Sequence, residues 1–426
     1  MRMLQFSPKA IYWCKTLSKF VSVQLIIQGL GFISGLLIVR TLDKQQYAYF
    51  TIANTMQGSM TVLSDSGITA GLSAIGGRVW QNRDQFSQLI NTALQLRIYL
   101  SIISVVAVTP ITLWLLISNG ASILSAILIV IVIILGLNAQ LTIGVLEIVP
   151  RLYSQINRIQ TIELVPSVSR LVLLLCAYFT SLNALIAVFI SSLSLLLKRS
   201  VLIKWVTQNI DSEAKTNQDY YHEILAVIKS LSPNTIFYCI QGQITVWLIS
   251  FFGNTQNIAE VGALSRLAVI FSIINSVIAG IISPSFARCH SVTLLHRKYW
   301  QIVGISCFLG FCILVFIAIF PVQILWLLGE QYAHLQNELF LIALSTIFSH
   351  VVGVMWSLNC SKAWVSYSWF SIPSTLTTQI ALLFLINLST IEGVIMFGIL
   401  SNIPSLALNI VLMYKGLASY KALDFE

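Results

Sequence analysis

The sequence predicts an all-α polytopic membrane protein: about twelve transmembrane helices in two six-helix lobes around a central cavity, with both termini in the cytoplasm. Composition is the first observation. Of the 426 residues, 57% are hydrophobic and only 9% charged, and the mean hydropathy is +0.86. Soluble domains carry about 25% charged residues, so this composition excludes a soluble fold. The other two observations are long apolar runs along the whole chain and an alternating distribution of basic residues.

The apolar runs have the length and pattern of membrane-spanning helices. A helical span needs about 20 mostly apolar residues, whereas a membrane β-strand has about ten of alternating polarity. The segment Ala121–Val149 contains the run SILSAILIVIVIILGL. In lipid every backbone polar group must be paired within its own segment, so such runs are helices. Taken in order, the predicted spans are residues 20–40, 46–64, 90–117, 121–147, 156–180, 183–205, 222–252, 257–285, 299–320, 336–360, 364–388 and 391–414.

The basic residues orient these spans, because short cytoplasmic loops hold the Lys and Arg residues of membrane proteins. With both termini inside, most of the 24 basic residues fall in inner segments or at inner helix ends. Arg40 and Lys44 fall in an outer loop, while Arg170 and Arg266 fall within spans. The net charge of +9 therefore reports topology, and its scattering excludes a nucleic-acid surface.

The chain divides near its middle. The polar segment Val206–Glu223 predicts a cytoplasmic linker, residues 206–222, between lobes at 1–205 and 223–426. Segments beginning at Gln28 and Gln241 also align at an offset of 213 residues (241 − 28), each starting with the letters IQG one residue earlier. Many secondary transporters are built from such repeats, with their site between the halves.

Catalysis, cofactors and metals are not expected. Most predicted outer loops are only a few residues long, and no phosphate-binding loop or Cys/His metal spacing is present. In the longest outer segment, Glu330, His334 and Glu338 have a helix-compatible spacing of four residues. Acid/base work is one interpretation, and a solvated face at the membrane boundary is the favoured one.

Polar and ionisable residues inside the spans are the candidate site. A charge in hydrocarbon is costly unless it faces water or a partner. Arg266 indicates a cavity, while Glu163 and Arg170, seven residues apart, indicate either a cavity or a structural ion pair. A cationic, amide-rich cleft suits an anionic saccharide, because Arg pairs with phosphate and amides bind hydroxyls. The predicted substrate-binding residues are Arg266, Arg170, Glu163, Gln28, Asn54, Gln57 and Gln241.

Three segments resemble a known family. They are Leu36–Ile68, with its Arg40-Thr41-Leu42 and Asp65-Ser66-Gly67-Ile68 motifs, Glu260–Arg288 with Arg266, and Pro321–Gly329. This pattern resembles the polysaccharide transporter family, the O-antigen and exopolysaccharide flippases of the multidrug/oligosaccharidyl-lipid/polysaccharide exporter superfamily.

The resemblance implies a flippase that moves an undecaprenyl-diphosphate-linked oligosaccharide across a bacterial inner membrane by alternating access. It also implies a glycan polymerase or export machinery as partner, and we expect a monomer. Arg266 matches a cavity arginine of the related lipid II flippases, but Gln28 and Ser34 stand where those carry first-helix arginines, which disfavours lipid II. The alternative is a cation-coupled multidrug exporter, with Asp65 and Glu163 as coupling candidates. A membrane glycan polymerase or ligase is less favoured, because a large outer loop is missing.

Overall fold

A computed structural model describes most of the chain. The described residues are 8–423, apart from 154, 209, 212–213, 253, 269–270, 272–273, 276–277, 279–281, 283–285, 287–288, 290, 363 and 365–366. All regular structure within this described part is helical. It forms two compact units, Met1–Ile240 and Gln241–Glu426.

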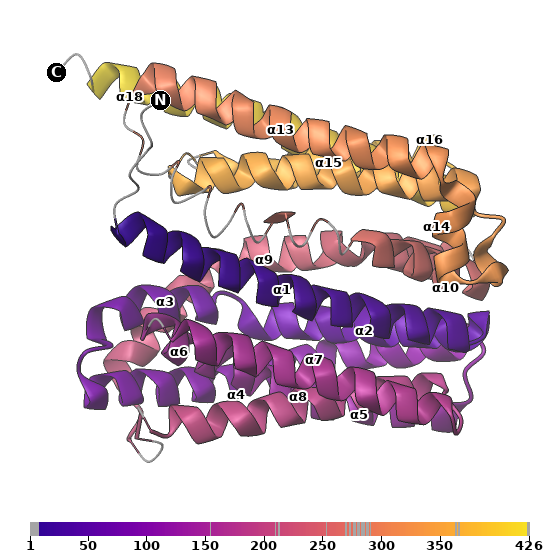
Figure 1. The fold of residues 1–426 in the computed structure, drawn as a ribbon, viewed down its shortest axis with the longest axis horizontal. Coiled ribbons are helices and arrows are strands. Elements are labelled where there is room, and N and C mark those ends of the chain that lie inside the picture. The colour runs from indigo at the N-terminus through magenta and orange to yellow at the C-terminus, as the bar shows by residue number, and fades with distance from the viewer. Residues whose placement is uncertain are drawn as a thin grey trace. The chain divides into compact units, whose positions relative to one another are not determined.

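The first unit is a bundle of long helices with α5 at its centre. α5 packs most extensively against α8 and also contacts α4 and α2, while α1 packs on α7 (Figure 1). The elements of this unit are α1 (Pro8–Thr41), α2 (Lys44–Asp65), α3 (Ile68–Val79), α4 (Arg83–Ser118), α5 (Ile123–Leu146), α6 (Ile148–Leu152), α7 (Ile156–Tyr178), α8 (Ala184–Val206) and the first part of α9 (Gln218–Phe252).

Local sequence explains where these helices begin. Asp43, Asn82, Ser122 and Asn183 are the N-cap residues of α2, α4, α5 and α8, and each side chain accepts a hydrogen bond from a backbone N–H of the first turn. α2 ends at a left-handed turn in which Gly67 has φ 101°, a conformation that glycine adopts without strain. The Asp-x-Gly motif noted in the sequence is this turn.

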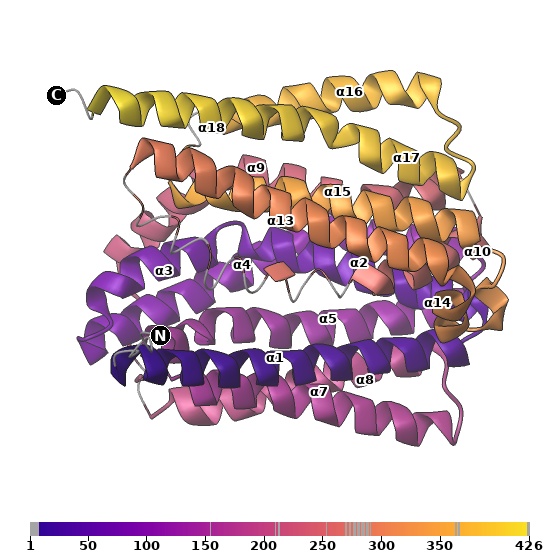
Figure 2. The same ribbon diagram turned by 45° about the horizontal axis from the view of Figure 1, so that its top comes forward.

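The second unit packs around α15. α15 contacts α13, α17 and α18, and α16 lies along α17 and α18 (Figure 2). Its elements after α9 are α10 (Thr255–Leu264), η1 (Ser265–Ala268), α13 (Val292–Ile319), α14 (Pro321–Leu328), η3 (Glu330–Tyr332), α15 (Gln336–Ser361), η4 (Ser368–Phe370), α16 (Ser371–Leu385), α17 (Ile391–Ser401) and α18 (Ile403–Leu423).

Within the described residues, eight helices are long and apolar enough to span a membrane, and a ninth if the two bent parts of α9 are one span. These parts, Thr235–Gly242 and Val246–Phe252, meet at 57°. The eight are Ser22–Thr41, Arg83–Ser118, Ile123–Leu152, Asn157–Tyr178, Ala184–Val206, Val292–Ile319, Gln336–Ser361 and Ile391–Ala418.

Three sequence predictions differ from the structure. The helix expected over 257–285 is broken, because α10 ends at Leu264 and continues as the 3-10 turn η1. The helix expected from 364 begins at Ser371, after the turn η4. The single helical face expected for Glu330, His334 and Glu338 is wrong: Glu330 lies in η3, His334 follows it, and Glu338 lies in α15.

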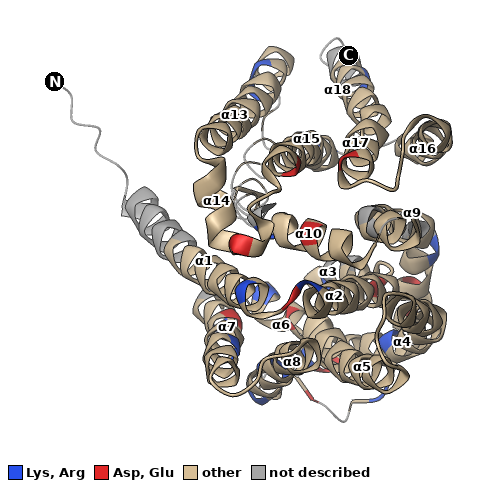
Figure 3. Ribbon diagram, turned by 90° about the vertical axis from the view of Figure 1, so that its right-hand side faces the viewer, with Lys and Arg blue, Asp and Glu red and all other residues tan. Residues whose placement is uncertain are grey.

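The surface carries many large apolar side chains. Val106 of α4, Phe308 of α13 and Phe384 of α16 are 68%, 66% and 86% exposed. The described helices, seen nearly end-on, carry few charged positions (Figure 3). Such surfaces are unfavourable in water and suit the hydrocarbon of a bilayer.

Part of the predicted linker 206–222 is fixed to α4. The Asn91 amide donates to the carbonyl oxygens of Ala214 (2.8 Å) and Asp211 (3.4 Å), and the Asn217 N–H donates to the Thr92 hydroxyl (3.0 Å). A segment held in this way is not a free hinge. The predicted lobe boundary at the linker stays a prediction, and the two compact units divide within α9.

Candidate functional site

A network of charged side chains lies at the end of the first unit that the sequence assigns to the cytoplasm. Its centre is an ion pair between α4 and α2, in which Arg97 Nη2 lies 2.6 Å from Asp65 Oδ1. The Arg97 side chain is 5% exposed and that of Asp65 29%. The Thr69 hydroxyl of α3 donates to the same Asp65 oxygen at 2.6 Å. One carboxylate therefore ties three helices together.

A glycine makes room for Arg97. A Cβ atom at Gly144 of α5 would lie 2.6 Å from Nη1 and 2.9 Å from Nη2 of Arg97, well inside van der Waals contact. The guanidinium group thus lies directly against the α5 backbone. Its Nε and Nη1 atoms are buried and make no hydrogen bond to the described residues.

A second ion-pair group joins α5, α6 and α8. Glu147, at the end of α5, lies 2.6 Å from Lys198 Nζ and 2.9 Å from Arg151 Nη2. The Glu163 carboxylate of α7 interacts electrostatically with the same two cations. Charges that would be costly in the membrane are thereby compensated inside the unit.

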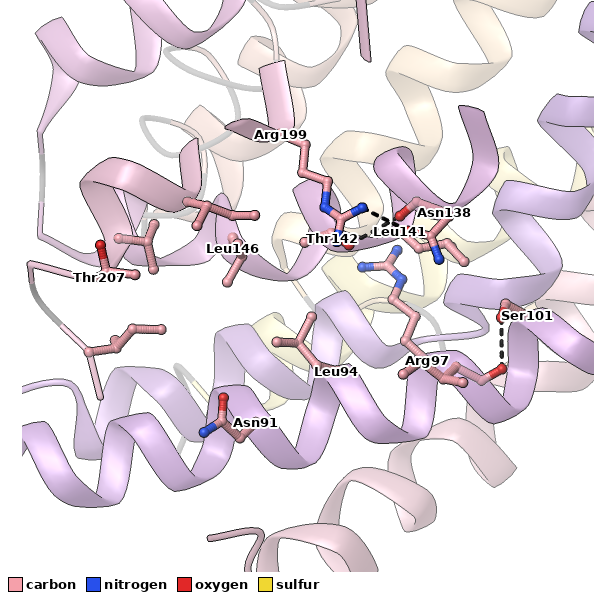
Figure 4. Close-up of a pocket in the computed structure, with 14 residues that line it drawn as sticks. Asn91, Leu94, Arg97, Ser101, Asn138, Leu141, Thr142, Leu146, Arg199 and Thr207 are labelled. Atoms are coloured by element: carbon pink, nitrogen blue, oxygen red, sulfur yellow. Dashed lines mark hydrogen bonds between the residues drawn. The ribbon is translucent and has the colours of Figure 1, made fainter. Parts of the chain in front are cut away.

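A cavity of about 380 Å³ lies beside this network, between α4, α5 and α8. Arg97 enters it from α4 and Arg199 from α8, and both guanidinium groups lie against α5 (Figure 4). Arg199 Nη1 donates to Asn138 Oδ1 at 2.9 Å. Apolar side chains form much of the remaining wall: Leu94, Ile98, Leu141, Leu146, Ile203, Val206 and Ile210.

The predicted amide residues have local roles in the described structure. Asn54 is exposed and donates to the Phe50 carbonyl of its own helix (2.8 Å). Gln57 lies against Gly136 of α5, where an added Cβ would be 2.9 Å from its amide nitrogen. Gln28 is half-buried on α1. None of these placements tests their predicted role in substrate binding.

In the second unit, Gln241 is one half of an amide pair between α9 and α16. Its Nε2 donates to Gln379 Oε1 (2.9 Å), and Gln379 Nε2 donates back at 2.5 Å. Arg266 lies half-buried in η1, which packs against α15. Arg266, which the sequence predicts to line a cavity, thus lies at the helix break.

A further charged pair joins α10 to the turn after η3. Glu260 Oε1 and His334 Nε2 are 3.1 Å apart, and the Glu260 side chain is 7% exposed. His334 was expected on a solvated face, and its side chain is indeed 56% exposed, but it also covers a buried carboxylate.

Sequence reasoning missed Arg97, Glu147, Lys198 and Arg199 as a group, because each fits the positive-inside pattern or a helix end. One local signal was available: Arg151 follows Glu147 by four residues, a spacing that pairs charges on a helix. Among the described residues, no group of three or more His, Cys, Asp or Glu side chains is placed to hold a metal ion.

Comparison with solved structures finds similar folds. A multidrug resistance MATE family transporter of the MOP superfamily, in its inward-facing conformation, has a TM-score of 0.69 and 16% identity over 95% of this chain and 99% of that chain. The outward-facing structure of such a transporter has a TM-score of 0.59 and 17% identity, over 96% and 94% of the two chains. A MOP superfamily transporter from Pyrococcus furiosus has a TM-score of 0.59 and 16% identity over 96% of this chain and 95% of that chain, and its binding pocket is described as having reverse polarity, suggesting a different function.

No protein-family model matches the chain, and no curated protein is similar to it in sequence. At this identity the structural similarity shows the fold. The protein is an all-helical, multi-pass membrane protein with the twelve-helix, two-lobe fold of MATE transporters, and the predicted fold class is confirmed at that level.

Proposed function

We propose that the protein is an alternating-access transporter that moves an anionic, undecaprenyl-diphosphate-linked oligosaccharide across a bacterial inner membrane for polysaccharide biosynthesis. Its fold supports transport, since similar structures include inward- and outward-facing transporters. The motifs around Arg40, Asp65 and Arg266 support the polysaccharide branch of the superfamily.

The observation that carries the substrate class is the sign of the charge available in the spans. Asp65 is held by Arg97, and Glu147 by Arg151 and Lys198. Carboxylates engaged in this way are poor sites for an exchanging cation or a cationic drug. Basic groups are instead in excess, which favours a phosphate-bearing substrate.

The solved structures support weighing charge in this way. The P. furiosus transporter has a fold similar to this chain, and its reversed pocket polarity is taken to indicate a different function from its relatives. Function is therefore better inferred from the charge of a site than from the fold alone. Arg266 and Arg170 are the residues we assign to the diphosphate, with Gln28, Asn54 and Gln57 as saccharide contacts.

A cation-coupled multidrug exporter is the second candidate. Glu163 favours it, because this carboxylate is half-buried within the span Asn157–Tyr178. Its electrostatic neighbours include the repelling Glu147 as well as the attracting Lys198 and Arg151. A carboxylate in such a balance is suited to gaining and losing a proton.

The test uses purified full-length protein in liposomes that contain a fluorescent undecaprenyl-diphosphate oligosaccharide. Wild-type protein is expected to expose the inner-leaflet pool to an external glycan-modifying enzyme, and Arg266→Ala to slow this at least tenfold, as expected for losing a charge-assisted contact. Arg83→Ala, which removes an exposed charge at the start of α4, is the matched control and is expected to have no effect.

Two results would overturn the proposal. One is that the wild-type protein does not move the lipid, although it is folded as well as the Arg83→Ala variant. The other is ion-gradient-dependent drug efflux from a deletion strain carrying the wild-type protein that is lost in Glu163→Gln. The second result would establish the exporter instead.

A further inference from the structure

Arg199 is a cation in a membrane helix for which the described residues provide no carboxylate. The neighbouring Lys198 is neutralised by Glu147 at 2.6 Å, and Arg97 by Asp65 at 2.6 Å. Arg199 donates instead to the neutral Asn138 amide oxygen, and its Nε is buried without a hydrogen bond to the described residues. A half-buried guanidinium group is costly in a membrane unless an anion is near.

The cavity beside Arg199 is the place where such an anion fits. Its volume, about 380 Å³, is within the usual range for small-ligand sites, and Arg97 and Arg199 both line it. Three hydroxyl groups also line the cavity, those of Ser101, Thr142 and Thr207, and each donates to a backbone carbonyl three or four residues earlier in the chain. Arg97 brings two buried N–H groups without hydrogen-bond partners in the described structure. The donors that remain for a ligand therefore belong to the two arginines, since Arg199 Nε is also buried without a hydrogen bond to the described residues.

The site lies on the cytoplasmic side of the membrane. Arg199 precedes the last residue of α8, Val206, by seven positions, or about 10 Å along the helix axis. The helix has 23 residues and is thus about 34 Å long, slightly more than the hydrocarbon core of about 30 Å. With about 2 Å of helix beyond each boundary, Arg199 lies roughly 8 Å inside the inner boundary, in the cytoplasmic half of the hydrocarbon core.

The cavity wall suits an acyl chain as well as a headgroup. Ile98 and Ile203 line the cavity and are also 57% and 36% exposed, so they connect it to the outer surface of the bundle. A soluble anion would leave this apolar wall unused. A lipid-linked oligosaccharide would need room for its sugars in addition to the phosphates.

We propose that this cavity is a binding site for one anionic phospholipid of the cytoplasmic leaflet, whose phosphate group is held by Arg199 and Arg97 and whose acyl chain lies along Ile98 and Ile203. Basic pockets between transmembrane helices on this side of a membrane are suited to anionic headgroups. This lipid site is separate from the proposed substrate-binding site, and the lipid proposal does not depend on the proposed function.

The test is native mass spectrometry of the full-length protein in phosphatidylcholine nanodiscs that contain phosphatidylglycerol. Wild-type protein is expected to retain one phosphatidylglycerol in preference to phosphatidylcholine. Arg199→Gln is expected to weaken this retention about tenfold, the effect of losing a charge-assisted hydrogen bond. Lys204→Gln removes an exposed charge from the same helix outside the cavity, and it is expected to change binding less than twofold.

A second variant covers the possibility that Arg199→Gln does not fold. Ile203→Trp fills the cavity and leaves both arginines in place, so it is also expected to abolish specific retention. Equal losses in Arg199→Gln and Lys204→Gln would overturn the proposal, since they would indicate general surface attraction. Displacement of the lipid by inorganic phosphate at comparable affinity would overturn it too, because the site would then bind soluble anions.

Discussion

The contact between Arg97 and Gly144 makes a quantitative prediction. Gly144→Ala adds one methyl group to α5, and in a helix this change alone is favourable by about 0.8–1.0 kcal/mol. At this position the methyl carbon would lie 2.6 Å from Nη1, 2.9 Å from Nη2 and 3.0 Å from Cζ of Arg97. Ordinary contacts of this kind begin near 3.4 Å, so the guanidinium group must move.

The movement has a cost that follows from burial. Arg97 is 5% exposed and cannot turn into water, so its displacement lengthens the 2.6 Å bond to Asp65. Overpacking costs roughly 1–3 kcal/mol, and complete loss of a buried ion-pair partner roughly 3–5 kcal/mol. We therefore expect Gly144→Ala to lower the free energy of unfolding by about 2 kcal/mol despite the better helix propensity.

Reversible unfolding of the protein in mixed micelles measures this loss. Gly304→Ala is the matched control, because it makes the same change within α13, where an added Cβ meets nothing within 4 Å. The control is expected to be neutral or stabilising. A third protein, Arg97→Ala with Gly144→Ala, is expected to be no less stable than Arg97→Ala alone, because the clashing group is gone.

The predicted clash between the added methyl group and Arg97 is refuted if the Gly144→Ala variant is as stable as the Gly304→Ala control. It is also refuted if the Gly144→Ala loss is unchanged in the Arg97→Ala background, since the cost would then come from another contact.

Two further predictions concern hydrogen bonds between separate elements. Gln241→Ala and Gln379→Ala each leave one amide of the α9–α16 pair without its partner, so each is expected to cost about 0.6–1.7 kcal/mol in unfolding experiments. The double variant is expected to cost less than the sum, and strict additivity would contradict a direct pair. Asn91→Ala removes the two hydrogen bonds to the carbonyls of Asp211 and Ala214, so faster amide exchange is expected at Ala214. Gln95→Ala, one turn further along α4, is expected to leave that exchange unchanged.

The fold class could be predicted from the sequence because lipid imposes one strong requirement, a long apolar helix for every crossing. Apolar runs such as the one in Ala121–Val149 state this directly. The break at η1 could not be predicted in the same way, since Ser265-Arg266-Leu267-Ala268 contains neither glycine nor proline. η1 packs against α15, and a tertiary contact of this kind cannot be predicted from the local sequence.

The candidate site was harder to predict than the fold for a similar reason. Arg199 and Lys198 are adjacent in sequence and look alike as inner basic residues, but they project in different directions from α8. Lys198 meets Glu147, and Arg199 meets Asn138 and the cavity. Whether a basic residue of α8 forms an ion pair, like Lys198, or lines the cavity, like Arg199, depends on which residue of α5 it contacts. α5 is distant from both residues in the sequence.

The attachment of Asp211, Ala214 and Asn217 to α4 has a consequence for dividing the protein into two polypeptides. A cut at residues 212–213, near the middle of the sequence, would place Ala214 and Asn217 on the second fragment, although their hydrogen-bond partners are on the first. A cut between Asn217 and Gln218 keeps those bonds within one fragment and leaves α9 intact. Co-expressed fragments are therefore expected to reassemble more efficiently from the later cut.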